Sequence, residues 1–118
     1  MQRFMFRSKI HRARITGTEL DYEGSIAIDR NLLLAADILP GEQVHVLNLN
    51  NAERLVTYVI EAAAGSGTVM LNGPAARLGM PGDPVVILSY GVFGDEEARA
   101  LESRVVHVDA ENRPLANL

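Results

Sequence analysis

A serine that directly follows a glycine, Gly24-Ser25, is the feature of this sequence with the most unusual chemical potential. The Ser25 hydroxyl can attack the Gly24 carbonyl and convert the peptide bond between them into an ester. Elimination across that ester, then hydrolysis, would leave residues 1–24 as one fragment and residues 25–118 as another that begins with a pyruvoyl group. Glycine suits this step because, without a Cβ atom, it tolerates backbone conformations that other residues resist. Most Gly-Ser pairs are ordinary turn residues, so the rest of the sequence has to support this interpretation.

A second group of reactive side chains lies on a predicted strand from Arg54 to Ile60. Its β-branched residues and its tyrosine favour a strand, and strand alternation places Arg54 and Tyr58 on one face and Thr57 on the other. An arginine and a tyrosine on one face could bind an anion and donate a proton beside it. Thr57 can join them in one site only if the strand is bulged or twisted, or lies at a subunit boundary, and we favour the boundary. A solvated strand face is the alternative for this pattern.

The stretch Asn72-Gly73-Pro74-Ala75 predicts the start of a short helix. Proline is favoured at the first helical position and glycine just past the end, so we expect a helical turn from Pro74 to Leu78 that Gly79 stops. Its first N–H groups, near Ala75 and Ala76, would be free and could bind a carboxylate or a phosphate. A plain helix start without a ligand is the alternative.

Composition limits the function classes that this chain can serve. The 118 residues, 47% of them hydrophobic, predict one globular domain over residues 1–118. A net charge of −4 offers no broad basic surface for nucleic acid. There is no cysteine, and His11, His45 and His107 lack metal-ligand spacing, so we expect no disulfide, no thiolate nucleophile and no metal site. No apolar run approaches the ~20 residues of a membrane span, and no signal peptide is recognisable. We therefore expect a cytoplasmic protein that binds neither nucleic acid nor membranes.

Short strand patterns dominate the chain. The predicted strands are residues 4–6, 10–15, 25–28, 44–49, 54–60, 68–71, 85–90 and 105–108. The run 85–90 is continuously apolar, which predicts a strand buried on both faces. Thr16-Gly17-Thr18 predicts a turn or bulge. The fold class that follows is mainly β.

Two short helices are also expected. Asp29 would cap a helix that includes residues 32–36 and that Pro40-Gly41 ends. Residues 95–101 predict a second helix, with acidic side chains at its positive end. The tail, residues 112–118, is expected to be loose.

One motif occurs twice. Leu39-Pro40-Gly41-Glu42 and Met80-Pro81-Gly82-Asp83 each combine Pro-Gly with an acidic residue, and each precedes an apolar strand. Two similar turns are one explanation, and a duplicated half-barrel with a pseudo-two-fold axis is the other. A closed barrel of two such halves would remove the exposed sheet edges that many short strands otherwise leave.

These motifs together resemble the pyruvoyl-dependent aspartate 1-decarboxylase family along nearly the whole chain. The matching segments are Lys9-Ile10-His11-Arg12, Tyr22-Glu23-Gly24-Ser25, Ile28-Asp29, Arg54-Leu55-Val56-Thr57-Tyr58, Gly65-Ser66-Gly67, Asn72-Gly73, Pro81-Gly82-Asp83 and Asp95-Glu96-Glu97-Ala98-Arg99. The resemblance implies a double-psi β-barrel with a few short helices. It also implies a homotetramer with active sites between adjacent subunits. The implied reaction is decarboxylation of L-aspartate to β-alanine and CO2, for pantothenate and coenzyme A biosynthesis.

The same resemblance implies a proenzyme that cleaves itself between Gly24 and Ser25 into a β chain, 1–24, and an α chain, 25–118. The cofactor is then a covalent pyruvoyl group derived from Ser25, whose ketone forms a Schiff base with the substrate amine. Its neighbouring amide carbonyl accepts the electrons that CO2 leaves behind. Thr57 is implied in the cleavage step, where its hydroxyl could stabilise the oxyanion that forms at Gly24.

The resemblance also assigns roles in catalysis. Tyr58 is implied as the proton donor to carbon after CO2 has left, and Arg54 as the residue that holds a substrate carboxylate at two points. Lys9 would add a second positive charge. The remaining implied substrate contacts are Thr57, Asn72, Gly73, Pro74 and Ala75, and Tyr22 is expected to line the site. Pro74 departs from the small residue of many relatives and, lacking an N–H, cannot donate a hydrogen bond to substrate.

Two alternatives remain open at this point. A non-enzymatic β-barrel module that binds an anion or a protein could use the Arg54 strand and the Gly73 helix start. Such a module has no use for Gly24-Ser25 beside matching Lys9, Thr57 and Tyr58. A decarboxylase acting on glutamate or another amino acid is the second alternative, and it would differ in the size of the substrate pocket.

Overall fold

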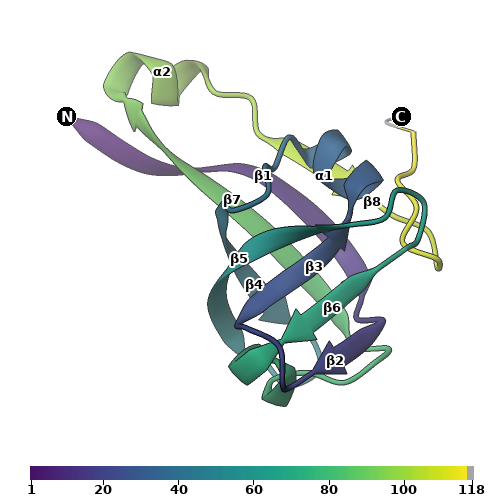
Figure 1. Ribbon diagram of the computed structural model, residues 1–118. Helices are drawn as coiled ribbons and strands as arrows, with labels where there is room; N and C mark the ends of the chain where they lie inside the picture. The colour runs from purple at the N-terminus through teal and green to yellow at the C-terminus, as the bar shows by residue number, and fades with distance from the viewer. Residues whose placement is uncertain (117–118) are drawn as a thin grey trace.

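The computed structural model describes residues 1–116, which form a strongly curved sheet with short helices at its margins (Figure 1). The strands are β1 (Gln2–Arg14), β2 (Gly17–Glu19), β3 (Ser25–Asp29), β4 (Gln43–Asn48), β5 (Arg54–Ala62), β6 (Val69–Asn72), β7 (Pro84–Gly94) and β8 (Arg104–His107). The helices are α1 (Arg30–Ala36), α2 (Asp95–Ala100) and the 3-10 helix η1 (Gly73–Arg77). The predicted mainly β fold with a few short helices is confirmed. Among these residues, we find no helix with the length and apolar character that crossing a membrane requires.

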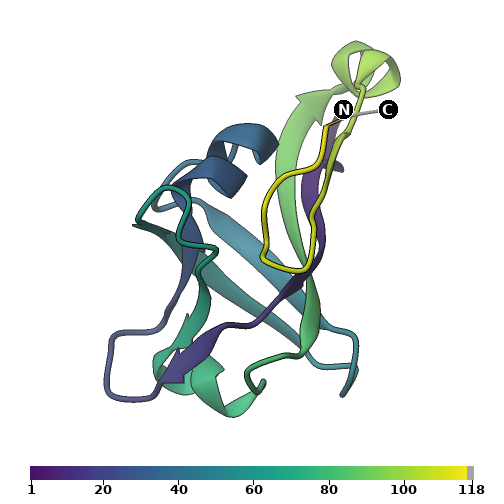
Figure 2. The same ribbon diagram turned by 90° about the vertical axis from the view of Figure 1, so that its right-hand side faces the viewer.

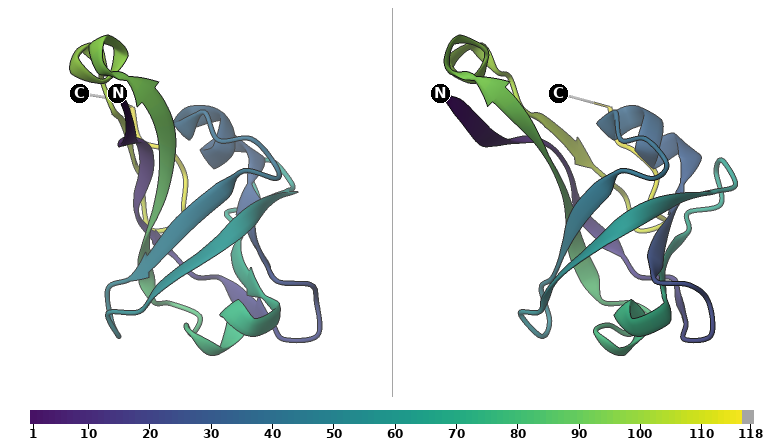
Figure 3. Two further views of the ribbon diagram at one scale, coloured as in Figure 1. Left: turned by 90° about the vertical axis from the view of Figure 1, so that its left-hand side faces the viewer. Right: turned by 60° about the vertical axis from the view of Figure 1, so that its left-hand side comes forward.

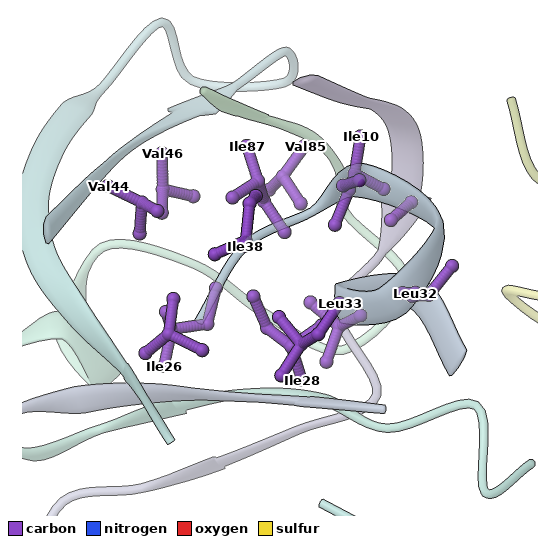
Figure 4. Packing of buried hydrophobic residues seen from close by; sticks show 14 of the residues in the cluster. Ile10, Ile26, Ile28, Leu32, Leu33, Ile38, Val44, Val46, Val85 and Ile87 are labelled. Carbon is purple, nitrogen blue, oxygen red and sulfur yellow. The ribbon is translucent and has the colours of Figure 1, made fainter. Parts of the chain in front are cut away.

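The strands form one sheet in the order β2-β6-β3-β5-β4-β7-β1-β8. β3 pairs in parallel with β5 and antiparallel with β6, so segments distant in sequence meet at the strand that begins with Ser25. The sheet curls around a single apolar core, which α1 covers at one end (Figures 1 and 2). Figure 4 shows side chains from β1, β3, β4, β7, α1 and the segment after α1 pointing into that core: Ile10, Ile26, Ile28, Leu32, Leu33, Ile38, Val44, Val46, Val85 and Ile87. All five residues of β3 are buried, which fixes the position of its first residue.

β1 is one long strand where we predicted two. It pairs with β7 along its length, with register shifts between Phe6 and Ser8 and between His11 and Ala13. Arg12, at the second shift, has a left-handed backbone with φ 65°. These bulges interrupt the alternation in the sequence without ending the strand. The outer ends of β1 and β7 extend away from the core with α2 at their tip (Figures 1 and 3).

Two other strand predictions differ from the structure. The turn expected at Thr16-Gly17-Thr18 is the start of β2, which pairs in parallel with β6. In β7, Val85 to Ile87 are buried as predicted, but Tyr90 is exposed because the strand leaves the core there.

The tail is anchored rather than loose at Asn112. This buried side chain donates hydrogen bonds to the carbonyl oxygens of Arg14 (2.8 Å) and Gly67 (2.9 Å). Pro114 forms a β-bridge with Val108. Residues 117–118 of the predicted loose tail lie outside the described residues.

The predicted cap of α1 is confirmed. The Asp29 carboxylate accepts hydrogen bonds from the backbone N–H groups of Asn31 (2.8 Å), Gly65 (3.0 Å) and Gly67 (2.8 Å). It therefore joins the helix start to the loop that precedes β6. The helix ends at Asp37, whose left-handed backbone (φ 54°) stops it before Pro40-Gly41, where we had predicted its end.

The repeated Pro-Gly motif has the symmetry that a duplication predicts. Gly41 and Gly82 have similar left-handed backbones, with φ 87° and 93°. The strands that follow, β4 and β7, pair antiparallel with Val46 opposite Ile87. The offset that places Gly41 on Gly82 also places Val46 on Ile87, so a local two-fold axis passes through this residue pair. The pairing supports a duplicated half-barrel over two unrelated turns.

Candidate active site

The predicted cleavage point lies where the chain enters β3. Ser25 is the first residue of that strand and is 2% exposed. Its Oγ atom donates a hydrogen bond to the Glu23 carbonyl oxygen (3.1 Å) and accepts one from Asn72 Nδ2 (3.1 Å). The hydroxyl is therefore held from both sides next to the peptide bond that it would attack. Gly24 itself is not among the residues with positive φ. The unusual backbone conformation that we expected at this glycine is therefore not seen.

Asn72 faces Ser25 across the β3–β6 pair, where the two residues are register partners. Its side chain is fully buried. The Nδ2 atom bonds Ser25, whereas the Oδ1 atom has no hydrogen-bond partner among residues 1–116. A buried acceptor without a partner costs about 1–3 kcal/mol. This oxygen is therefore available to any donor that enters the site beside Ser25.

The start of η1 lies directly against the cleavage loop. Gly73 has φ +64°, and a Cβ atom built on it would lie 2.7 Å from the Gly24 nitrogen and 2.8 Å from the Tyr22 carbonyl oxygen. Only glycine satisfies both the backbone conformation and this close approach. Pro74 follows and packs toward Gly24, since a Cβ atom on Gly24 would lie 3.6 Å from Pro74 Cδ.

The predicted helical turn is present as a 3-10 helix that begins one residue earlier than expected. No side chain caps its first N–H groups, as the sequence indicated. Pro74 is exposed and Ala75 is buried, so only part of this turn faces solvent. Tyr22, which we expected to line the site, is exposed, and its backbone rather than its ring contacts Gly73.

β5 carries the second group of predicted residues, and its alternation is as expected. Leu55 and Val59 are buried, whereas Arg54 and Tyr58 are exposed, Tyr58 by 39%. β3 runs parallel to β5 with Ile26 opposite Val59. Extending that register by one and two residues places Ser25 level with Tyr58 and Gly24 level with Thr57. Thr57 is half-buried and lies on the face opposite Arg54 and Tyr58.

His45 is a neighbour of Arg54 that the sequence did not single out. Its Nδ1 atom lies 3.2 Å from Arg54 Nη1, and its ring packs edge-on against Tyr90 with the ring centroids 4.9 Å apart. A groove of ≈ 480 Å³ opens beside it, lined by Phe4, Gln43, His45, Tyr90, Gly91 and Val92. The alternation of Val44-His45-Val46 could have placed His45 on the outer face. The register that brings it to Arg54 could not be obtained from the sequence.

Lys9 lies in a different part of the sheet from Ser25. It lies on β1, opposite Leu88 of β7 and Val105 of β8, and three strands separate β1 from β3 in the sheet order. Its Nζ atom sits 5.4 Å from the centre of the Phe6 ring. Nearby, burial lowers the pKa of His11, and the positive charges of Lys9, His107 and Arg12 lower it further.

The arrangement supports acyl chemistry at the Gly24-Ser25 bond, and Arg54 on the exposed face of β5 can bind a carboxylate. Among the residues described, no group of three or more His, Cys, Asp or Glu side chains could hold a metal ion. The candidate site combines four features: the buried Ser25 hydroxyl, the buried Asn72 amide, the η1 turn that begins at Gly73, and the exposed face of β5 with Arg54 and Tyr58.

Comparisons with known proteins agree with this chemistry. The family described as aspartate decarboxylase matches residues 1–115. Aspartate 1-decarboxylase of Thermoanaerobacter pseudethanolicus is 54% identical over 115 residues, and aspartate 1-decarboxylase 1 of Gloeobacter violaceus is 59% identical over 116 residues; each alignment covers 98% of both chains. Among solved structures, the rationally designed double-psi β-barrel protein mkDPBB_sym_86 is similar with a TM-score of 0.49 and 18% identity, over 67% of this chain and 91% of its own. From the family match and the two relatives, this chain belongs to the aspartate decarboxylase family.

Proposed function

We propose that this chain cleaves itself between Gly24 and Ser25, and that it uses the resulting pyruvoyl group to decarboxylate L-aspartate to β-alanine and CO2 in the cytoplasm, for pantothenate and coenzyme A biosynthesis. The decarboxylase activity follows from family membership over residues 1–115. The observation that carries the cleavage step is the buried Ser25 hydroxyl, held between the Glu23 carbonyl and the Asn72 amide. Family membership favours this enzyme over the non-enzymatic module that the sequence had left open.

The cleavage step needs a serine oxygen close to the preceding carbonyl and a donor for the developing charge. Ser25 Oγ bonds to the Gly24 carbonyl carbon, and the Gly24–Ser25 amide bond breaks to leave an ester. Loss of the Ser25 α-proton then expels the Gly24 carboxylate, which frees residues 1–24. Addition of one water molecule to the remaining dehydroalanine releases ammonia and leaves the pyruvoyl end. Thr57, level with Gly24 on β5, is the donor for the oxyanion of the first step.

The residues around Ser25 fit a pyruvoyl group. The Oδ1 atom of Asn72 lacks a partner in the described part of the chain, and the absence of a Cβ atom at Gly73 leaves room for the backbone beside Gly24. When formed, this group supplies a ketone that takes up the substrate amine and accepts the electrons that CO2 leaves behind.

The residues of this chain would then hold the substrate and move a proton. Arg54 presents a planar guanidinium to a substrate carboxylate, and Asn72 Oδ1 accepts a hydrogen bond from the substrate nitrogen. Tyr58, level with Ser25 on the exposed face of β5, donates the proton that carbon takes up after CO2 has left. Gly73 and Ala75 would contact substrate through their backbones, whereas Pro74 can contribute only its carbonyl and its ring.

The position of Lys9 supports a homotetramer with active sites between subunits. Lys9 lies on β1, three strands from β3 in the sheet order, and in such an assembly a neighbouring copy would supply its charge to Ser25. Large apolar side chains are also exposed next to the site and on the β1–β7 extension, among them Val56, Tyr58, Val92 and Phe4, the last by 83%. Burying them between copies would stabilise such an assembly.

Trapping with borohydride tests this function directly. Protein mixed with L-aspartate and sodium borohydride should gain covalent substrate mass on the 25–118 fragment only, and aspartate without borohydride should yield β-alanine and CO2. Ser25→Ala is the matched control and should gain no mass. Equal labelling by L-glutamate would point to the alternative substrate, and no labelling by either amino acid would contradict the proposal.

A further inference from the structure

The outer face of the β4–β5 pair joins Arg54 to a histidine. In this antiparallel pair His45 lies opposite Val56, and Leu47 lies opposite Arg54, so His45 is the diagonal neighbour of Arg54 on the same face. Their side chains meet with 3.2 Å between His45 Nδ1 and Arg54 Nη1. Tyr58 lies opposite Gln43, on the other side of His45. His45 therefore stands between the positions of the proposed carboxylate-binding arginine and the proposed proton donor.

The contact determines the protonation state of the histidine. A guanidinium has only donors, so Nδ1 of His45 must be the acceptor in this hydrogen bond and must carry no proton. The ring is then neutral, with its proton on Nε2. Tyr90 of β7 holds the ring edge-on, which limits its rotation.

Few charged or titratable groups face His45. The charged or titratable groups that face it are Arg54 and Tyr58 from β5 and Tyr90 from β7. The other residues that line the groove beside it, Phe4, Gln43, Gly91 and Val92, carry no charge. No carboxylate among these neighbours would compensate a second positive charge next to Arg54.

We propose that His45 is a positioning residue for Arg54 that makes substrate binding depend on pH, an inference that rests on the proposed function of Arg54. With His45 neutral, its Nδ1 lone pair fixes one edge of the guanidinium and leaves the other edge for the substrate carboxylate. When His45 takes up a proton, Nδ1 becomes a donor, the hydrogen bond is lost and two cations face each other. The sign follows: substrate binds well while Nδ1 carries no proton, and its KM is higher at acidic pH, where Nδ1 carries one.

The test compares KM and kcat for L-aspartate at about pH 8 and about pH 5.5. The wild-type KM should be about three- to tenfold higher at the lower pH, the range expected for one lost hydrogen bond. His45→Asn keeps an acceptor near the Nδ1 position but does not titrate, so the ratio of its two KM values should be close to one. His45→Leu removes the acceptor and should show the high KM at both pH values. His107→Asn, a change at an exposed histidine outside this face, should keep the wild-type rise.

A second measurement follows the contact itself. Long-range 15N–1H NMR of the processed enzyme at about pH 8 should show His45 with a bare Nδ1 and a protonated Nε2. An Nδ1–H tautomer, or a His45→Asn enzyme with the same acid rise in KM as wild type, would overturn the inference. These outcomes are distinct from failure of the proposed function, in which wild-type protein would form no β-alanine at either pH.

Discussion

Two parts of the proposed site differ in burial and in the hydrogen bonds that one chain supplies to them. We call Ser25, Asn72 and Gly73 the corner, and the exposed side of β5 with Arg54 and Tyr58 the face. At the corner, Ser25, Asn72 and Gly73 are buried, and Ser25 is hydrogen-bonded on both sides. On the face, Arg54 and Tyr58 are exposed, and the second predicted cation, Lys9, lies elsewhere in the sheet. The difference matches the two reactions that we propose. The proposed cleavage takes its nucleophile and the bond that breaks from the chain itself and needs only water from outside, whereas decarboxylation has to admit an amino-acid substrate.

Removing the hydroxyl at the corner should have the largest effect. Ser25→Ala leaves no nucleophile for the Gly24 carbonyl, so we expect an intact chain and no β-alanine production. A denaturing gel and a CO2-release assay measure the two results. Because Ser25 also accepts the Asn72 hydrogen bond, circular dichroism should accompany them to show that the variant is folded. Cleavage or activity in this variant would contradict the role of Ser25.

Removing the phenol from the face should separate the two reactions. Tyr58→Phe keeps the ring but loses the proton donor, so kcat for decarboxylation should fall by about 10²–10⁴-fold. Cleavage should proceed at the wild-type rate, because the groups that hold Ser25 lie in the loop before β3 and on β6. The comparison of fragment formation with CO2 release in one preparation checks this. A variant that decarboxylates at full speed would remove Tyr58 from the mechanism.

A methyl group at Gly73 should disturb the corner through sterics. Gly73→Ala costs about 1–2 kcal/mol for the left-handed backbone, and its Cβ atom would also lie 2.7 Å from the Gly24 nitrogen. We expect slower cleavage as well as lower stability, measured by gel time course and thermal unfolding. Gly41→Ala is the matched control, since Gly41 has φ +87° with nothing within 4 Å of an added Cβ atom. It should lose stability alone, and equal cleavage rates in the two variants would show that the contact is unimportant.

The smallest expected effect is on carboxylate binding. Arg54→Lys keeps the charge but loses the planar two-point donor. KM for L-aspartate should therefore rise by about tenfold with little change in kcat. Arg99→Lys, on the exposed side of α2, serves as the control and should leave KM unchanged. A lower kcat at constant KM would indicate that Arg54 acts in the transition state instead of in binding.

Local features of the fold could be predicted from the sequence where the determining contacts are themselves local. Asp29 caps α1 because a carboxylate next to a helix start meets the free N–H groups two residues on. The alternation of β5 likewise follows from side-chain type. By contrast, β1 was predicted as two strands. Its pairing with β7 shifts register between Phe6 and Ser8 and again at Arg12, and without knowledge of β7 such an interruption of the alternation resembles the end of a strand.

The site depended on pairings that no local pattern reveals. The sequence drew attention to Ser25, Arg54, Tyr58 and Asn72, but their placement requires the parallel β3–β5 pair and the antiparallel β3–β6 pair. The same holds for Gly73. It was expected to contact substrate, and its close approach to Gly24 becomes visible only when η1 is placed against the loop before β3. His45 was missed because one histidine on an apolar strand has no distinctive spacing.

Intact-mass spectrometry of the purified protein after prolonged incubation tests the central claim most directly. The account predicts two species, residues 1–24 ending in a free carboxylate, and residues 25–118 with a mass lower by one ammonia than a chain that begins with serine. A full-length chain alone, or a 25–118 fragment that retains its serine amine, would contradict it.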